Sequence, residues 1–248
     1  MSAPARAEGS DTLAGDSAFT FRSSKLFSVL AVVVAYLLIE AALWSYGPVQ
    51  KALGWIDASW IVACTLLQRR SARELGLRGE GFRRSIWFPL IALAVAAIWF
   101  GIARATGSVT IPLRTLHFWR ADSYALWAFE QEFILQSFLF LNLEQLLGMR
   151  RAIAGSTLLF AAAHFPNPLL MVCTLFGGLM FTSVFARYRN LWTVGIVHAL
   201  LGLTIAFTAP DNINHHMRVG RGYWRYHVAP PRAAIVPSGP RVADSRQR

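Results

Sequence analysis

The sequence predicts an all-α fold, a polytopic transmembrane helix bundle of about seven, or eight, membrane segments. Two observations predict it. Of the 248 residues, 55% are hydrophobic and only 15% are charged, whereas a soluble domain carries about 25% charged residues. The apolar residues also form runs, several of them close to the roughly 20 residues that a bilayer requires, and the arginines gather between the runs. The chain is therefore expected to be an integral membrane protein.

The net charge of +11 raises nucleic-acid binding as an alternative. The arginines, however, lie in connectors and tails beside the apolar runs, where such residues set topology and contact anionic lipid headgroups. There is no basic stripe with a recognition module for nucleic acid. We therefore expect membrane lipid as a partner, and no nucleic acid.

The N-terminal part begins with a tail and then enters the membrane. Residues 1–22 are rich in Ala, Ser and Gly without apolar periodicity, which predicts disorder. The transmembrane helical domain follows over residues 23–208, and its first span is predicted at 26–46. Glu40 lies inside that span, where we expect it near the helix end, solvated or paired with an arginine.

Six further apolar helices are predicted, at 53–67, 86–102, 124–147, 152–164, 169–186 and 191–207. The connector 69–85 is the densest in arginine, which argues for a cytoplasmic location. The segment 104–122 is expected to be a polar loop on the opposite side. The helix at 152–164 is too short for a full crossing, so it is truncated or begins earlier. Residues 209–248 form a basic tail rich in Pro and Arg, predicted to be exposed and disordered, and its sidedness stays open.

Polar side chains interrupt three of the apolar helices. Glu132 and Gln136 are four residues apart and share a helix face, and Gln131 lies about 100° round from Glu132. His164 and His198 each lie in a separate apolar helix. A buried histidine on one helix is, taken alone, more often a hydrogen-bonded core residue. Polar groups on three neighbouring spans favour one shared site, because each would otherwise face lipid unpaired.

Two of these segments resemble known sequence motifs. Gln131-Glu132-Phe-Ile-Leu-Gln136 is similar to the Glu-Glu-x-x-x-Arg motif of the CPBP (Abi) family, which comprises CAAX proteases and bacteriocin-processing intramembrane endopeptidases. Phe160-x-x-x-His164, which is followed by Pro-Asn-Pro, is similar to the second motif of that family. Each motif alone has low specificity, but their order and helical context agree with the family.

The segment that begins at His198 is similar to the third family motif, His-x-x-x-Asn. The resemblance therefore covers about residues 120–207. It implies a helical bundle with a conical cavity open to the cytoplasm, in the inner (plasma) membrane of a bacterium. It also implies hydrolysis of a peptide bond in a membrane-anchored protein or peptide. In the family, the first-motif Glu and second-motif His activate water, and the third-motif His and Asn stabilise the oxyanion. The positions carried over as catalytic are Gln131, Glu132, Gln136, His164 and His198, and those carried over as substrate-binding are Phe160, Asn167 and Gly202.

The chain departs from the family pattern at three of these positions. Gln131 stands at the catalytic Glu position, and a carboxamide cannot act as a general base. Gln136 stands where Arg is expected, and Gly202 stands where Asn is expected. Loss of both the Glu and the Arg removes two charges that can neutralise one another, so the two changes are consistent with a coordinated exchange.

Two arrangements would keep the site catalytic. Glu132 could act as the base while His164 and His198 position water, or the three side chains could form a two-His-one-carboxylate zinc site. The zinc arrangement rests only on the residue types. Two other functions stay open: a catalytically inactive homologue that binds a membrane partner, and an unrelated small transporter. Substrate and oligomeric state are not indicated by the sequence.

Overall fold

The structure is a computed structural model that describes residues 25–109 and 118–227. All its regular elements are helices, so the all-α prediction is confirmed for this part of the chain. The predicted N-terminal tail at 1–22 and the last residues of the C-terminal tail, 228–248, lie outside the described residues, as does the middle of the predicted loop 104–122.

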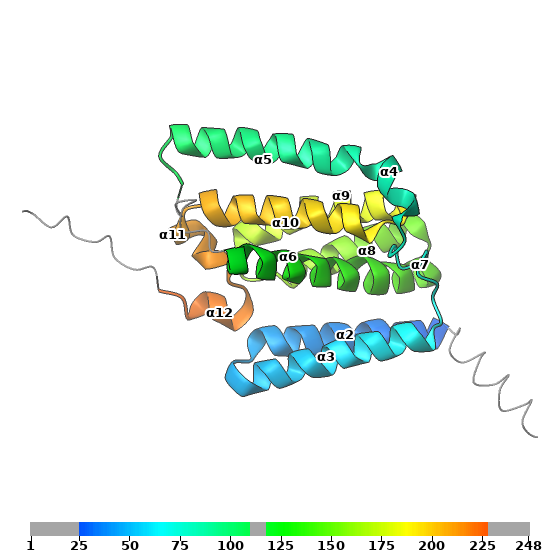
Figure 1. The fold of residues 1–248 in the computed structure, drawn as a ribbon. Helices are drawn as coiled ribbons and strands as arrows, with labels where there is room; N and C mark the ends of the chain where they lie inside the picture. The colour runs from blue at the N-terminus through cyan, green and yellow to red at the C-terminus, as the bar shows by residue number, and fades with distance from the viewer. Residues whose placement is uncertain (1–24, 110–117, 228–248) are drawn as a thin grey trace, which may run out of the picture.

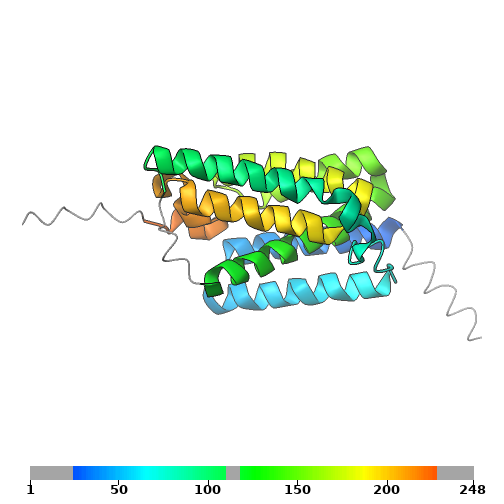
Figure 2. The same ribbon diagram turned by 45° about the horizontal axis from the view of Figure 1, so that its top comes forward.

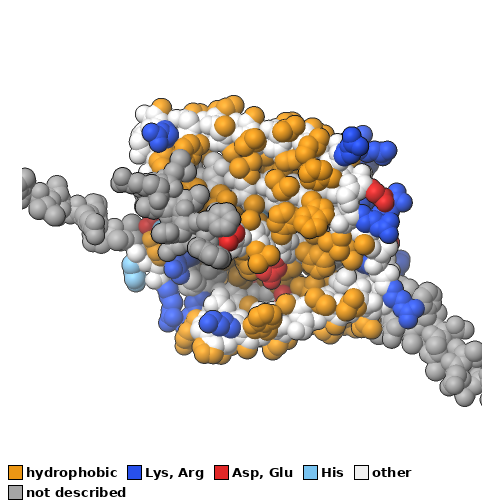
Figure 3. Space-filling model, viewed as in Figure 1, with side chains coloured by type: hydrophobic (Ala, Val, Ile, Leu, Met, Phe, Trp, Pro, Cys, Tyr) orange, Lys and Arg blue, Asp and Glu red, His pale blue; other side chains and the backbone are white. Residues whose placement is uncertain are grey.

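Among the described residues, four helices are long and apolar enough to cross a membrane: α2 (Lys25–Trp44), α5 (Trp87–Ala105), α9 (Pro168–Tyr188) and α10 (Leu191–Thr208). Figure 3 shows hydrophobic side chains spread over the middle of one face of the molecule, with most of its Lys and Arg near the two ends. A wide apolar band between charged ends is the surface that a bilayer covers. The chain is therefore an integral membrane protein, while the number of about seven spans stays a prediction.

The other described helices are α3 (Gly47–Leu67), η1 (Gly79–Gly81), α4 (Phe82–Ser85), α6 (Phe118–Glu132), η3 (Phe133–Phe140), α7 (Leu141–Leu147), α8 (Met149–Ala162), α11 (Asp211–Asn214), η4 (His215–Met217) and α12 (Gly220–Trp224). Three helix starts differ clearly from the prediction. Helix α6 begins at Phe118 rather than at residue 124, so the predicted loop 104–122 ends earlier than expected. Helix α3 begins at Gly47 rather than at residue 53, because Pro48 suits a first helical turn. Helix α8 begins at Met149 rather than at Ala152, directly after Gly148, whose φ of 79° ends the preceding helix.

The helices α6, η3 and α7 follow one another without a break and lie at the centre of the bundle (Figure 1). Their middle section, η3, is eight residues of π-helix, a wider turn that is common at functional sites. Its side chains Leu135, Phe138 and Phe140 are buried in the hydrophobic core. Core packing on this section therefore fixes the position of Glu132 and Gln136.

Helix α10 lies between α5 and α6, as both ribbon views show (Figures 1 and 2). Two glycines of α10 allow α6 to come close. A Cβ atom at Gly195 would overlap the ring of Phe129, and one at Gly202 would overlap the hydroxyl of Tyr124. Small residues permit this close approach between membrane helices. The contact places the C-terminal end of α6 beside the middle of α10.

The segment from residue 209 to residue 227, predicted as part of an exposed tail, folds back on the bundle instead. The side-chain amide of Asn167 donates hydrogen bonds to the carbonyls of Asn214 at 2.8 Å and Arg218 at 3.1 Å. The backbone N–H of Gly220 donates to the carbonyl of Phe165 at 2.8 Å, and α12 packs against α2. The C-terminal segment thus holds the loop between α8 and α9 in place.

Candidate active site

Glu132 is the centre of a buried hydrogen-bonded cluster where α6 meets η3. Its side chain is 0% exposed. Its Oε1 accepts a hydrogen bond from Nδ1 of His198 on α10 at 2.8 Å, and its Oε2 accepts one from the side-chain amide of Gln136 at 3.0 Å. The structure therefore brings together three of the predicted site residues. Both carboxylate oxygens already accept a hydrogen bond within the protein.

The carbonyl oxygen of the Gln136 side chain is buried, and within the described part of the chain no protein group donates to it. A buried acceptor left unpaired costs about 1–3 kcal/mol, so such atoms are normally satisfied by water or by a ligand. The side-chain NH₂ of Gln136 thus bonds to Glu132, while its side-chain carbonyl oxygen is left without a partner among the described residues. One buried acceptor of the cluster is therefore left for a water molecule or a ligand.

His164 lies near this cluster but in a turn, two residues after α8 ends at Ala162, and not inside a helix as predicted. Its Nδ1 lies 2.7 Å from the backbone carbonyl of Phe160. Because a carbonyl only accepts, Nδ1 carries the hydrogen and Nε2 keeps its lone pair. The turn forms because Pro166 and Asn167 follow, and proline disfavours helix at the preceding residue.

An aromatic side chain links the two histidines. The ring of Phe160 lies 4.9 Å from the imidazole of His164 and 5.9 Å from that of His198, measured between ring centroids. The ring of Phe181 stacks on His198 at 5.7 Å. Phe160 therefore lies against both imidazoles, and the aromatic contacts restrict how the rings can turn.

The segment that carries these residues matches a known family. Residues 115–204 match the model of the family described as type II CAAX prenyl endopeptidase Rce1-like. This segment is similar to the CAAX prenyl endopeptidases of that family. The predicted resemblance is thereby confirmed over about a third of the chain, including all three motifs. No curated protein and no solved structure matches the chain.

Two residues carried over from the family lie less directly in the cluster. Gln131 is half-buried on α6, next to Glu132. Asn167 is fully buried and caps α9, since its Oδ1 accepts the N–H of Leu170 at 3.1 Å. Its amide is used by the C-terminal segment, so these contacts hold the fold together. A role for Asn167 in substrate binding stays a prediction that its contacts do not support.

Tyr124 is a residue beside the third-motif segment that reasoning from the sequence missed. Its hydroxyl lies against Gly202, one helical turn beyond His198 on α10. Gly202 is the position where the Rce1-like segment departs from the Asn of the third motif. The tyrosine hydroxyl therefore occupies space that a side chain at this position would fill. The signal in the sequence was Gly202 itself. A glycine one turn from a buried histidine leaves room that a side chain of a neighbouring helix has to fill.

The zinc arrangement is not tested by the contacts of these side chains. Across the described ranges 25–109 and 118–227, no three His, Cys, Asp or Glu side chains are grouped so that they could hold a metal ion. Glu132 already accepts two hydrogen bonds, and His198 presents Nδ1 to that carboxylate. The zinc site stays a prediction.

Proposed function

We propose that this protein is an intramembrane endopeptidase that hydrolyses a peptide bond of a membrane-anchored protein or peptide with an activated water molecule. The CAAX protease family match over residues 115–204 supports the reaction class. The observation that carries the proposal is the buried hydrogen bond of 2.8 Å between Glu132 and His198. A carboxylate that orients an imidazole is the arrangement by which enzymes make histidine a base.

In the proposed mechanism, His198 accepts the proton and Glu132 positions it. Since Nδ1 of His198 faces the carboxylate, Nε2 is left to take a proton from water. The water oxygen then attacks the peptide carbonyl, and the positive charge on the imidazole lies beside Glu132. The same proton later passes from Nε2 to the leaving amine. This division of roles needs no carboxylate at Gln131.

His164 is proposed to hold the water. Its lone pair on Nε2 can accept the second hydrogen of the water, which turns the oxygen toward the substrate. The His164→Gln variant should lower kcat by about 10²-fold, while the protein still accumulates in the membrane. The measurement is cleavage of a library of membrane-anchored peptides by the purified protein in detergent, in which the wild type should cleave at least one member.

Two results of this assay would contradict the proposal. If the wild type were inactive and the Gln131→Glu variant cleaved a peptide, the protein would be a protease fold that has lost its catalytic base. Equal cleavage by the wild type and by His164→Gln would remove His164 from the site. The first result would favour the second candidate, a catalytically inactive homologue that binds a membrane peptide. One observation favours that candidate, namely that both oxygens of Glu132 are engaged.

The hydroxyl of Tyr124 is proposed to donate to the oxyanion, in place of the Asn that Gly202 replaces. The Tyr124→Phe variant should lower kcat by about 10²-fold with little change in KM, because one oxyanion donor acts mainly in the transition state. Kinetics of the cleaved peptide would measure this. The midpoint of thermal unfolding of the Tyr124→Phe variant should match that of the wild type. An unchanged kcat would show that Tyr124 only fills space.

The location in the cell is also a proposal. The family resemblance supports the inner (plasma) membrane of a bacterium, and the arginines of the connector 69–85 support a cytoplasmic position for that end of the bundle. Nothing in the family match favours the small transporter.

A further inference from the structure

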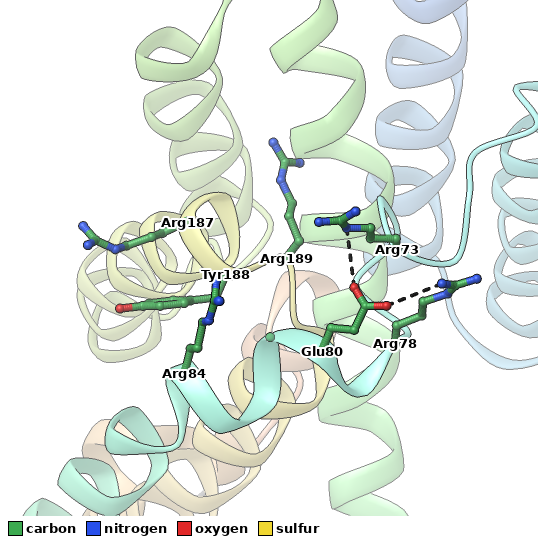
Figure 4. A pocket seen from close by; sticks show the side chains of 8 residues that line it. Arg73, Arg78, Glu80, Arg84, Arg187, Tyr188 and Arg189 are labelled. Atoms are coloured by element: carbon green, nitrogen blue, oxygen red, sulfur yellow. Dashed lines mark hydrogen bonds and ion pairs between the residues drawn. The ribbon is translucent and has the colours of Figure 1, made fainter.

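A cavity of about 310 Å³ lies at one end of the bundle, between the connector that follows α3 and the C-terminal end of α9 (Figure 4). Its charged lining residues are Arg73, Arg78, Glu80, Arg84, Arg187 and Arg189. The volume falls within the range of small-ligand sites, about 300–1,000 Å³. The lining is predominantly basic, and the proposed peptidase site uses none of these side chains.

The carboxylates near the cavity neutralise only part of its positive charge. Glu80 lies 3.6 Å from Arg73 and 3.5 Å from Arg78, and all three side chains are exposed. Arg189 is matched by Glu144 outside the lining, since its Nη2 lies 2.7 Å from each carboxylate oxygen. Five arginines therefore face two glutamates, which leaves a local excess of positive charge.

The backbone that carries the arginines is held in place by specific contacts. The side-chain amide of Asn190 donates to the carbonyl of Arg78 at 3.0 Å, and the N–H of Leu191 donates to the carbonyl of Gly76 at 2.8 Å. Gly81 packs so closely on α9 that a Cβ atom would overlap the carbonyl of Tyr188. The connector is thus fixed to the turn between α9 and α10, so the backbone positions of its arginines are set by the fold.

The cavity lies at the edge of the membrane-spanning part. Helix α5 begins at Trp87 and α9 ends at Tyr188, and both helices are candidate spans. The rings of Trp87 and Tyr188 lie 6.4 Å apart, edge to face, and Trp87 is 42% exposed. Tryptophan and tyrosine gather at the level of lipid headgroups. A ligand of this cavity would therefore lie at headgroup depth.

A neighbouring cavity of about 260 Å³ shares two of the arginines but is more nearly neutral. It is lined by Arg70, Arg73, Arg189, Glu74 and Glu144 with one leucine. The N–H and the hydroxyl of Ser71 both bond to Glu74 and hold the pKa of its carboxyl below its usual range. With two glutamates against three arginines, this second cavity is the poorer anion site.

From these observations we propose that the first cavity binds the phosphate of an anionic phospholipid headgroup. Figure 4 shows Arg73 and Arg84 reaching toward the space between the connector and α9, while Arg187 points outward. Guanidinium groups match phosphate oxygens with paired hydrogen bonds. Compensation of the α9 dipole would explain Arg187 and Arg189, but it would not explain the arginines that the connector contributes.

The test is native mass spectrometry of the full-length protein in detergent with short-chain lipids. The wild type should retain dioctanoyl phosphatidylglycerol in preference to dioctanoyl phosphatidylcholine. The double variant Arg73→Gln/Arg84→Gln should bind phosphatidylglycerol about twentyfold more weakly, since each arginine near a headgroup contributes about fivefold. The variant Glu80→Gln should bind more tightly, because it frees two arginines, and a misfolded protein could not produce this gain.

A matched control is Arg150→Gln/Arg151→Gln, two exposed arginines at the start of α8 that do not line the cavity. This variant should bind phosphatidylglycerol like the wild type. An equal loss in both double variants would show diffuse surface charge and overturn the proposal. If millimolar inorganic phosphate displaced the lipid, the proposal that the bound phosphate belongs to a lipid would be wrong, and the site would be assigned to free phosphate. An unchanged or weaker affinity in Glu80→Gln would also contradict the proposal.

Discussion

Replacing Glu132 by Gln is expected to lower kcat for peptide hydrolysis by about 10⁴-fold, the loss seen when a carboxylate that orients a catalytic histidine becomes an amide. The carboxylate accepts from Nδ1 of His198 at 2.8 Å, whereas an amide can present its NH₂ to that nitrogen. His198 would then adopt the other tautomer, with the hydrogen on Nε2. The proton acceptor would be lost although the shape of the site is kept.

The measurement is single-turnover cleavage of a membrane-anchored peptide, with Glu130→Gln as the matched control. Glu130 lies on the same helix and is exposed, so the same chemical change there should leave kcat within about twofold of the wild type. Circular dichroism and thermal unfolding would establish that both variants fold. A Glu132→Gln variant that keeps a tenth or more of the wild-type rate would rule out the proposed role of the carboxylate.

Replacing Gly195 by Ala should destabilise the bundle by about 1–3 kcal/mol and remove activity. The added Cβ would overlap the ring of Phe129, and overpacking a filled contact forces the two elements apart. Because α6 carries Glu132 and α10 carries His198, separating these helices also lengthens the hydrogen bond on which the proposed mechanism depends. The midpoint of thermal unfolding in detergent and the cleavage rate would measure the two effects.

Two further variants make this result specific. Gly101→Ala adds the same methyl group to α5, where nothing lies within 4 Å of the new Cβ, so its stability should equal or slightly exceed that of the wild type. The double variant Gly195→Ala/Phe129→Ala should be more stable than the sum of the single changes predicts, since the ring that is overlapped is gone. Additive effects in this cycle would show that Gly195 and Phe129 are not coupled.

The helices and the central polar residues could be predicted because their causes are local. Runs of apolar residues specify helices in a membrane whatever their neighbours are. Glu132 and His198 were recognisable since an ionisable group inside such a run needs a partner. The sequence also indicated that Gln136 shares a face with Glu132, and the hydrogen bond of 3.0 Å agrees with this spacing.

The features that were missed depend on contacts between distant segments. The π-helical section η3 is part of an apolar run that equally suits an α-helix, and packing within the bundle decides between them. Tyr124 could not be placed from its own position, because its role depends on the space left by Gly202 on another helix. The start of the C-terminal segment has the composition of a disordered tail, yet Asn214 and Gly220 receive partners from the loop after α8.

The hydrogen bonds that join Asn167 to Asn214 and Phe165 to Gly220 set an order for biosynthesis. The loop that carries His164 is tied down by residues that leave the ribosome some fifty positions after it. Chains are made from the N-terminus onward, and segments can fold as they emerge. A nascent chain whose membrane helices are already inserted would still lack this tie. The loop that carries His164 can therefore take its final position only after residues 214–220 have been made.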